Sequence, residues 1–170
     1  MNKSKIEWCD MTWNPITGCL HQCEYCYAKG IANRFKSNGS LHQHGNWVMM
    51  LESHYEHPKI KGIYDIRKPL CRGTVKHYGK DLPLEISHYP FGFAPTFHRY
   101  RLSEPAKTKK PQTVFVGSMA DVFGEWIPDE WIAEIVNACR NAGVPVFLKD
   151  NLAKIWGEPL IQEFPWEVEK

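Results

Sequence analysis

A strand–helix–strand pattern in the second half of the chain constrains the fold more than any other feature. Thr113–Val116 is a short run of β-branched and aromatic residues, which is typical of a buried strand. A helix is predicted from Asp129 to Gly143, because acidic residues occupy its first turn and apolar residues recur at helical spacing. Val144–Leu148 is a second predicted strand. Such a connection normally places its two strands side by side and parallel, so we predict an α/β fold.

The carboxyl ends of these strands are the expected place for functional residues, because loops at that edge carry function in parallel α/β sheets. Three loops meet this description. They follow Ile16, Val116 and Leu148, and the second and third begin with Gly117–Asp121 and Lys149–Asn151.

A second helix is predicted just after the first of these loops. Tyr27, Ile31 and Phe35 recur at i, i+4 and i+8, with Ala28 and Ala32 alongside, which gives an apolar face at helical spacing. The small and polar residues Ser37–Ser40 are expected to end this helix.

The first loop holds a cluster of cysteines: residues 18–28 read G-C-L-H-Q-C-E-Y-C-Y-A. Cys19, Cys23 and Cys26 form a C-x3-C-x2-C pattern, and three thiolates on a short loop can ligate three irons of a [4Fe–4S] cluster. The fourth iron would stay open to a substrate or cofactor, as in catalytic metal sites. The alternatives are a structural zinc site with His21 as fourth ligand and a redox-active dithiol.

Composition excludes several classes of protein. The chain has 170 residues, 43% of them hydrophobic, and a net charge of +2, which suits one globular domain and does not indicate a nucleic-acid or membrane partner. The sequence has no signal segment and no apolar run long enough to span a membrane, so a cytoplasmic protein with reduced thiols is expected. The remaining cysteines, Cys9, Cys71 and Cys139, are isolated, and Cys139 lies on the apolar face of its predicted helix.

The cysteine loop resembles the signature of radical S-adenosylmethionine (radical SAM) enzymes, C-x3-C-x-aromatic-C, with Tyr25 in the aromatic position. The resemblance implies that the three cysteines bind a [4Fe–4S] cluster whose open iron binds S-adenosylmethionine. It also implies an electron donor such as flavodoxin or ferredoxin, and hydrogen abstraction from an unidentified substrate. Tyr25 would then pack near the adenine of S-adenosylmethionine.

Further segments resemble a phage-associated, radical-SAM-like family of unknown function. They are Ile6–Trp8, Thr12–Pro15, Thr17–Cys19, Cys26–Ala28, Phe97–Leu102, Lys110–Pro111, Val114–Gly124, Ala142–Asp150 and Leu160–Pro165. In that family further strand–helix units separate the segments here found at 114–124 and 142–150. We therefore expect a single domain over residues 1–170, shortened internally near 129–143, and a reduced or partial parallel (β/α) barrel with the cluster loop after its first strand.

The resemblance and the strand ends together give candidate cofactor-binding residues. Gly117 allows a ligand to approach the backbone, and Ser118 and Asp121 can hydrogen-bond the ribose or amino group of S-adenosylmethionine. Lys149 is a candidate contact of a carboxylate. Asn14 would orient either the cofactor or the loop, or form a turn with Pro15.

Two other functions remain open at this point. The chain can be a non-catalytic iron–sulfur or zinc-binding module of phage origin that has lost the centre of its barrel. A weaker alternative is nucleic-acid processing, because the aromatic and basic stretch Tyr89–Arg101 can stack on bases, although such aromatic residues are also typical of a core. The oligomeric state is not indicated, although dimerisation would cover exposed strand edges.

Overall fold

A parallel pair of strands lies in the first of three sheets and leads into the cysteine loop. The computed structural model describes residues 1–165 except 37–40, 44–45, 51, 73–84 and 158. In the first sheet, β2 (Met11–Trp13) pairs in parallel with β10 (Val114–Val116) and antiparallel with β1 (Asn2–Lys3). The strand expected at 113–116 therefore forms, and it brings together segments about 100 residues apart in the sequence.

The second sheet continues directly from the first. β3 (Ile16–Thr17) begins three residues after β2 ends and pairs antiparallel with β9 (Thr96–His98). β9 in turn pairs in parallel with β6 (Tyr64–Ile66). The chain thus passes from one sheet to the next at Asn14–Pro15, and the cysteine loop begins directly after β3.

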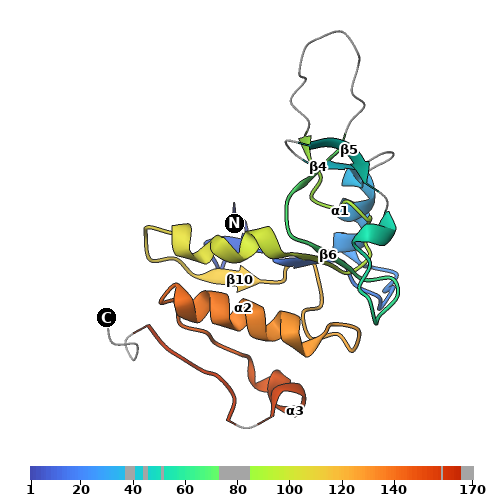
Figure 1. Cartoon of the computed structure of the whole chain (residues 1–170). Coiled ribbons are helices and arrows are strands. Elements are labelled where there is room, and N and C mark those ends of the chain that lie inside the picture. Colours follow the sequence, from blue (N-terminus) through green and yellow to red (C-terminus); the bar gives the residue numbers. More distant parts are fainter. Residues whose placement is uncertain (37–40, 44–45, 51, 73–84, 158, 166–170) are drawn as a thin grey trace.

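The third sheet is entirely antiparallel and lies apart from β10 and the second helix (Figure 1). Its strands, in spatial order, are β5 (Asn46–Met50), β4 (Leu41–Gln43), β7 (Leu70–Arg72) and β8 (Glu85–Ile86). The α-helices are α1 (Tyr27–Phe35), α2 (Asp129–Asn141) and the short α3 (Ala153–Trp156). The 3-10 helices are η1 (Glu52–His54), η2 (Arg99–Ser103), η3 (Pro105–Lys107) and η4 (Asp150–Leu152).

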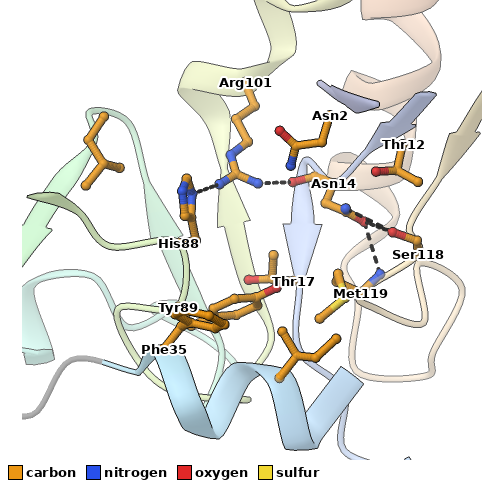
Figure 2. A pocket seen from close by; sticks show the side chains of 12 residues that line it. Asn2, Thr12, Asn14, Thr17, Phe35, His88, Tyr89, Arg101, Ser118 and Met119 are labelled. Atoms are coloured by element: carbon orange, nitrogen blue, oxygen red, sulfur yellow. Dashed lines mark hydrogen bonds between the residues drawn. The ribbon is translucent and has the colours of Figure 1, made fainter. Parts of the chain in front are cut away.

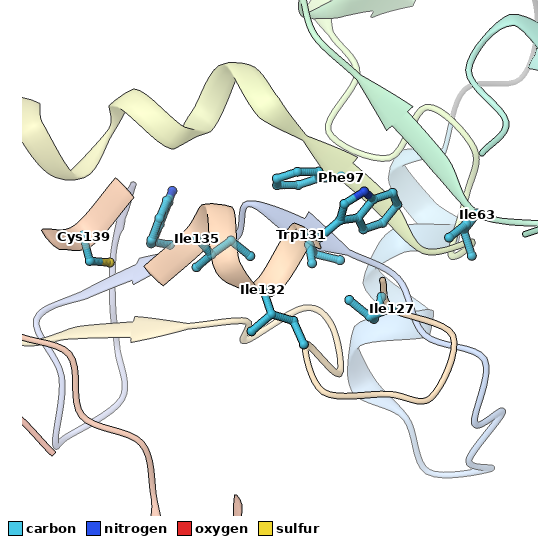
Figure 3. Packing of buried hydrophobic residues seen from close by; sticks show 9 residues of the cluster. Ile63, Phe97, Ile127, Trp131, Ile132, Ile135 and Cys139 are labelled. Carbon is cyan, nitrogen blue, oxygen red and sulfur yellow. The ribbon is translucent and has the colours of Figure 1, made fainter. Parts of the chain in front are cut away.

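The main core lies between α2 and the first two sheets. Trp131 of α2 packs on Phe97 of β9 with ring centroids 5.0 Å apart (Figure 3). An aromatic pair of this kind contributes about 0.5–1.5 kcal/mol beyond its buried area. Trp13 of β2 is buried in the same cluster. Because the cluster joins α2 to both sheets, it fixes the two strand ends that flank the cysteine loop.

Arg99 ties the second sheet to α2. Its Nε lies 2.7 and 2.8 Å from the two carboxylate oxygens of Asp65 on β6, and Nη1 donates to Glu134 on α2. The guanidinium also lies 4.7 Å from the ring centroid of Phe97. The forked geometry of arginine suits two carboxylates at once, so this contact orients α2 on the sheet.

The expected partial parallel barrel is wrong. Among the described residues the strands form small sheets of three, three and four strands; two are mixed, one is antiparallel, and none closes into a barrel. β1 pairs antiparallel with β2 on the side where a barrel would continue with a parallel strand, and β3 pairs antiparallel with β9 in a separate sheet. The fold thus combines small mixed sheets with α2.

The predicted strand at Val144–Leu148 does not pair with β10. Instead, Leu148 N–H donates to Ile161 O, Val146 N–H donates to the side chain of Glu163, and Phe147 forms a single antiparallel bridge with Gln162. Pro145 removes one backbone donor from this segment, which disfavours a central strand position. The predicted neighbour relationship within the strand–helix–strand pattern is therefore also wrong. Among the described strands β10 pairs with β2 and lies at the edge of its sheet.

The helix predictions fare differently. α2 is confirmed at Asp129–Asn141, and its expected apolar face, including Cys139, is buried. α1 is confirmed as a helix, and of its predicted apolar residues Ala28 and Ala32 are buried, whereas Tyr27 and Phe35 are 63% and 48% exposed. The predicted stop at 37–40 lies outside the described residues.

Candidate functional site

The cysteine loop and the loop after β10 lie together at the carboxyl ends of β2 and β10. Gly117 N–H donates to Trp13 O at 3.0 Å, and Gly18 N–H donates to Met119 O at 2.9 Å. Gly18 and Ala120 form a parallel bridge that extends the pairing beyond the strands. The cysteine loop follows β3, and these contacts hold it beside the loop that follows β10.

The three cysteines differ in their surroundings. Cys23 is exposed, whereas Cys19 and Cys26 are partly buried. Cys19 Sγ accepts from the N–H of His21, and Cys26 Sγ caps α1 by accepting from the N–H of Lys29, both at 3.4 Å. Hydrogen bonds from backbone N–H groups to sulfur are among the interactions that tune iron–sulfur clusters. Gln22 in the loop adopts a left-handed conformation with φ of 54°, which helps the short spacer turn.

Burial raises the pKa of the Cys19 thiol above its usual value. The negative charges of Asp121, Cys23 and Cys26 act in the same direction, and the His21 N–H opposes them. Cys19 therefore prefers the protonated form when no cation is bound. Coordination by a metal requires the thiolate, so metal binding at this loop would release protons.

His21 connects the two loops. Its Nε2 lies 2.8 Å from Asp121 Oδ2, and its ring packs edge-on against Trp126 with centroids 4.8 Å apart. The other oxygen of Asp121 accepts from the N–H of Phe123 at 3.1 Å. The sequence suggested His21 as a zinc ligand and Asp121 as a cofactor contact, and the structure pairs them with each other.

Asn14 organises the loop after β10. Its Nδ2 donates to Ser118 Oγ at 3.0 Å, and its Oδ1 accepts from the N–H of Met119 at 3.0 Å (Figure 2). The hydroxyl of Tyr27, directly after Cys26, donates to Ser118 O at 2.5 Å. Of the roles considered for Asn14, the structure thus shows loop orientation.

Two predicted site residues lie differently from the rest. Tyr25 is on the cysteine loop and is 90% exposed, so its ring is open to a ligand. Lys149 Nζ lies 5.2 Å from the ring centroid of Trp8, which packs on Phe115. Among the described contacts, none brings Lys149 to the cysteine loop.

A cavity of about 340 Å³ adjoins the two loops (Figure 2). Asn14 and Ser118 form part of its wall, and Ile31 and Phe35 of α1 line it from the helix side. This part of the predicted apolar face of α1 therefore borders the cavity as well as solvent. That explains why apolar residues at helical spacing are not buried in the core.

Arg101 and His88 are functional candidates that sequence reasoning did not single out. Arg101 lines the cavity, donates from Nη1 to Asn14 O at 2.9 Å, and has Nη2 3.0 Å from His88 Nδ1. Tyr89 lines the same cavity. The only signal was the aromatic and basic character of residues 89–101, and other members of that stretch, such as Phe97, are core residues.

His98 is a buried polar residue behind the cavity. Its Nε2 lies 2.8 Å from the hydroxyl of Thr17, which lines the cavity, and Nδ1 lies 3.4 Å from the hydroxyl of Tyr100. Burial lowers the pKa of His98 well below 6.5, and the positive charges of Arg101 and His88 lower it further. His98 is therefore neutral in the folded protein.

This burial makes the stability of the protein depend on pH. The unfolded chain binds a proton at His98 below pH 6.5, whereas the folded chain does not, so unfolding becomes easier as the pH falls through that value. We expect the free energy of unfolding to drop by about 1 kcal/mol between pH 6.5 and 5.5 from this group. Urea unfolding at several pH values measures it. His98→Gln should remove this component and exposed His54→Gln should not; an equal pH slope in His98→Gln would contradict the assignment.

The donor set of the loop fits an iron–sulfur cluster in chemical type: three thiols on one short segment, two of them partly buried and near backbone donors. In the described part of the chain, no three His, Cys, Asp or Glu side chains are grouped so that they could hold a single metal ion. In an iron–sulfur cluster each cysteine bonds a different iron atom. The three thiols therefore do not have to converge on a single ion, and need only surround the cluster.

The helices give one finding about membranes. Within the described residues, none is long and apolar enough to cross a bilayer.

Comparison with known proteins identifies a family. Comparisons with curated proteins and with solved structures each find no match. A family described as a protein of unknown function (DUF5131) matches residues 3–149, which include both loops, the cavity residues and α2. Since the match covers most of the chain, this protein belongs to the DUF5131 family.

Proposed function

We propose that this chain is a radical-SAM-like iron–sulfur enzyme whose Cys19, Cys23 and Cys26 hold a [4Fe–4S] cluster. The chemistry that such a cluster supplies when bound is one-electron cleavage of S-adenosylmethionine to methionine and a 5′-deoxyadenosyl radical, which takes a hydrogen atom from the substrate; the electron comes from a donor of the flavodoxin or ferredoxin class. The cytoplasm is the proposed compartment, since its reducing conditions keep the thiols free.

One observation supports this proposal most directly. The three-cysteine loop and the Gly117–Asp121 loop are joined by His21–Asp121, Tyr27–Ser118 and Gly18–Met119 contacts at the carboxyl edge of a parallel strand pair. A cofactor that spans both loops would meet thiolates on one side and small, polar residues on the other. Asn14 holds the second loop in position, and the exposed ring of Tyr25 is available to an adenine.

The residues proposed to contact S-adenosylmethionine are therefore Tyr25, Gly117, Ser118 and Asp121, with Asn14 as a positioning residue. Asp121 would have to exchange its contact with His21 for the ribose or amino group. Lys149 is left out, because it stacks on Trp8.

A second candidate is a non-catalytic iron–sulfur or zinc module. Two hydrogen bonds favour it, that of Asp121 with His21 and that of Ser118 with Asn14. The side chains of Asp121 and Ser118, which a cofactor would contact, already have partners in the protein. In this alternative, metal binding stabilises the two loops and no iron is left open to a ligand.

Anaerobic purification and reconstitution distinguish the two candidates. Iron, sulfide and zinc are counted, and the EPR spectrum of the reduced protein is recorded alone, with S-adenosylmethionine, and with S-adenosylhomocysteine, which lacks the sulfonium. We expect about four irons and four sulfides per chain, and a spectral change with S-adenosylmethionine. The same samples are analysed for 5′-deoxyadenosine after addition of a reductant.

The other outcomes reject the enzyme proposal. A full cluster whose spectrum ignores S-adenosylmethionine indicates the non-catalytic iron–sulfur module. Zinc without iron indicates the structural zinc site.

A further inference from the structure

The cavity beside the cysteine loop combines a positive charge with flat, apolar walls. It has a volume of about 340 Å³, which lies within the range of roughly 300–1,000 Å³ that small-molecule sites occupy. It lies next to the loop, because Thr17 and Ser118 line it, and Ser118 is bonded through its carbonyl to Tyr27, the residue after Cys26. The cavity thus adjoins the loop that is proposed to hold the cluster, where a substrate of the proposed reaction is expected.

The positive charge of Arg101 is not matched by an acid. One N–H group donates to Asn14 O and another lies 3.0 Å from His88 Nδ1, and neither partner is an acid. Among the described residues, no carboxylate forms an ion pair with this guanidinium, whereas the neighbouring Arg99 pairs with both Asp65 and Glu134. A guanidinium has five N–H groups, so Arg101 retains donors for a ligand.

The contacts of Arg101 also fix its direction. Asn14 O anchors one arm of the guanidinium and His88 anchors the other, as Figure 2 shows at the cavity wall. A guanidinium held in this way loses little further freedom when it binds an anion. Its positive charge lowers the pKa of Tyr89 and of His98, although burial is the larger influence on each and raises the pKa of Tyr89 overall.

Flat and apolar side chains form another part of the wall. Phe35 and Tyr89 both line the cavity, and Lys36 and Tyr89 form a parallel bridge that brings the end of α1 to Tyr89. Ile31 and Met119 add aliphatic surface. Aromatic walls next to a cation suit a ligand that has a ring and an acidic group.

We propose that this cavity binds a small organic anion with a flat ring, a phosphate monoester or carboxylate that pairs with Arg101, and that this anion is the substrate of the proposed reaction. The assignment of this anion as the substrate rests on the proposed function. The anion site itself rests on the cavity and on Arg101. Arg101 is assigned as a binding residue and Asn14 and His88 as residues that position it.

Matched pairs of ligands that differ in charge test the proposal. Binding to the reconstituted full chain is measured by calorimetry for uridine monophosphate against uridine, and for 4-hydroxyphenylacetate against its neutral amide. The first pair probes phosphate and the second probes carboxylate. At least one anion is expected to bind about 10- to 100-fold more tightly than its neutral partner, the range of a charge-assisted hydrogen bond. S-adenosylmethionine should not displace it.

Three variants locate the effect. Arg101→Gln should abolish the preference for the anion and leave the neutral ligand unaffected. Arg101→Lys, which keeps the charge and can still donate to Asn14 O, should show a smaller loss and serves if Arg101→Gln does not fold. Exposed Arg67→Gln removes the same charge elsewhere on the chain and should change neither member of a pair.

The results separate this inference from the proposed function. Equal binding of charged and neutral ligands, or an unchanged preference in Arg101→Gln, would overturn the anion site even if the cluster responds to S-adenosylmethionine. Competition with S-adenosylmethionine would overturn the substrate assignment, because the anion would then occupy the cofactor site. Charge-dependent binding in a protein that takes up no iron would overturn the proposed reaction and leave only the anion site.

Discussion

Replacing Cys23 with alanine is expected to reduce the iron content of the reconstituted protein from about four atoms per chain to nearly none. The loop offers three thiolates in total, and the two that remain in this variant cannot retain a cubane cluster. Cys23 gives the clearest test of the three, because it is exposed, whereas Cys19 and Cys26 also accept backbone hydrogen bonds that shape the loop. Iron and sulfide analysis after anaerobic reconstitution measures the effect, and circular dichroism checks that the chain remains folded.

Cys139→Ala is the matched control for this experiment. Cys139 is buried in α2 within the main core, and burial raises the pKa of its thiol to about 11, so it is a packing residue. Its replacement should lower thermal stability slightly and leave the iron content unchanged. Full iron retention in Cys23→Ala would reject the ligand assignment, and equal loss in both variants would point to a general folding defect.

The parts of the fold that could be predicted from the sequence are those set by local patterns. α2 has acidic residues in its first turn and a continuous apolar face from Trp131 to Cys139, and both features act within the helix itself. β10 was identified by its β-branched and aromatic residues. In each case the local residue pattern determines whether a helix or a strand forms, and the rest of the protein only has to bury its apolar side.

Pairing between distant strands could not be predicted in this way. Val144–Leu148 has the composition of a buried strand, but it bridges to Gln162, and the strand that pairs with β10 is β2, about 100 residues earlier in the sequence. The apolar face predicted for α1 is buried only in part: the small residues Ala28 and Ala32 pack inside, whereas Tyr27 and Phe35 stay largely exposed. Periodicity identifies a helix, and the neighbouring elements decide which of its faces is covered.

The candidate site shows the same division. The cysteines could be recognised because their spacing within eight residues carries the chemistry. Arg101 could not, because its role depends on contacts with Asn14, 87 residues away, and with His88. Asn14 and Ser118 were identified as separate candidates, and their direct contact across 104 residues became visible only in the fold.

Gly18, the residue before the first cysteine, occupies the most confined backbone position of the site. Its φ is +90°, a conformation that side chains disfavour. A Cβ at this position would lie 2.4 Å from Ala94 O and 2.7 Å from Phe93 O, and both are main-chain atoms that cannot move aside easily. The next residue, Cys19, donates its N–H to Phe93 O at 3.1 Å. The start of the cysteine loop is therefore held against the backbone of Phe93–Ala94.

Gly18→Ala is therefore expected to displace the loop and to lower the free energy of unfolding by at least about 3 kcal/mol, with reconstituted iron reduced by more than half. Two glycines separate the causes. Gly62 has a φ of +76° but open space at its Cβ position, so Gly62→Ala should show only the conformational cost of about 1–2 kcal/mol and keep the iron. Gly30 lies within α1 with open space, so Gly30→Ala should be neutral or stabilising by up to about 1 kcal/mol. If Gly18→Ala lost no more stability than Gly62→Ala, the backbone of Phe93–Ala94 would not be what confines the loop, and the close approach could not account for a glycine at this position.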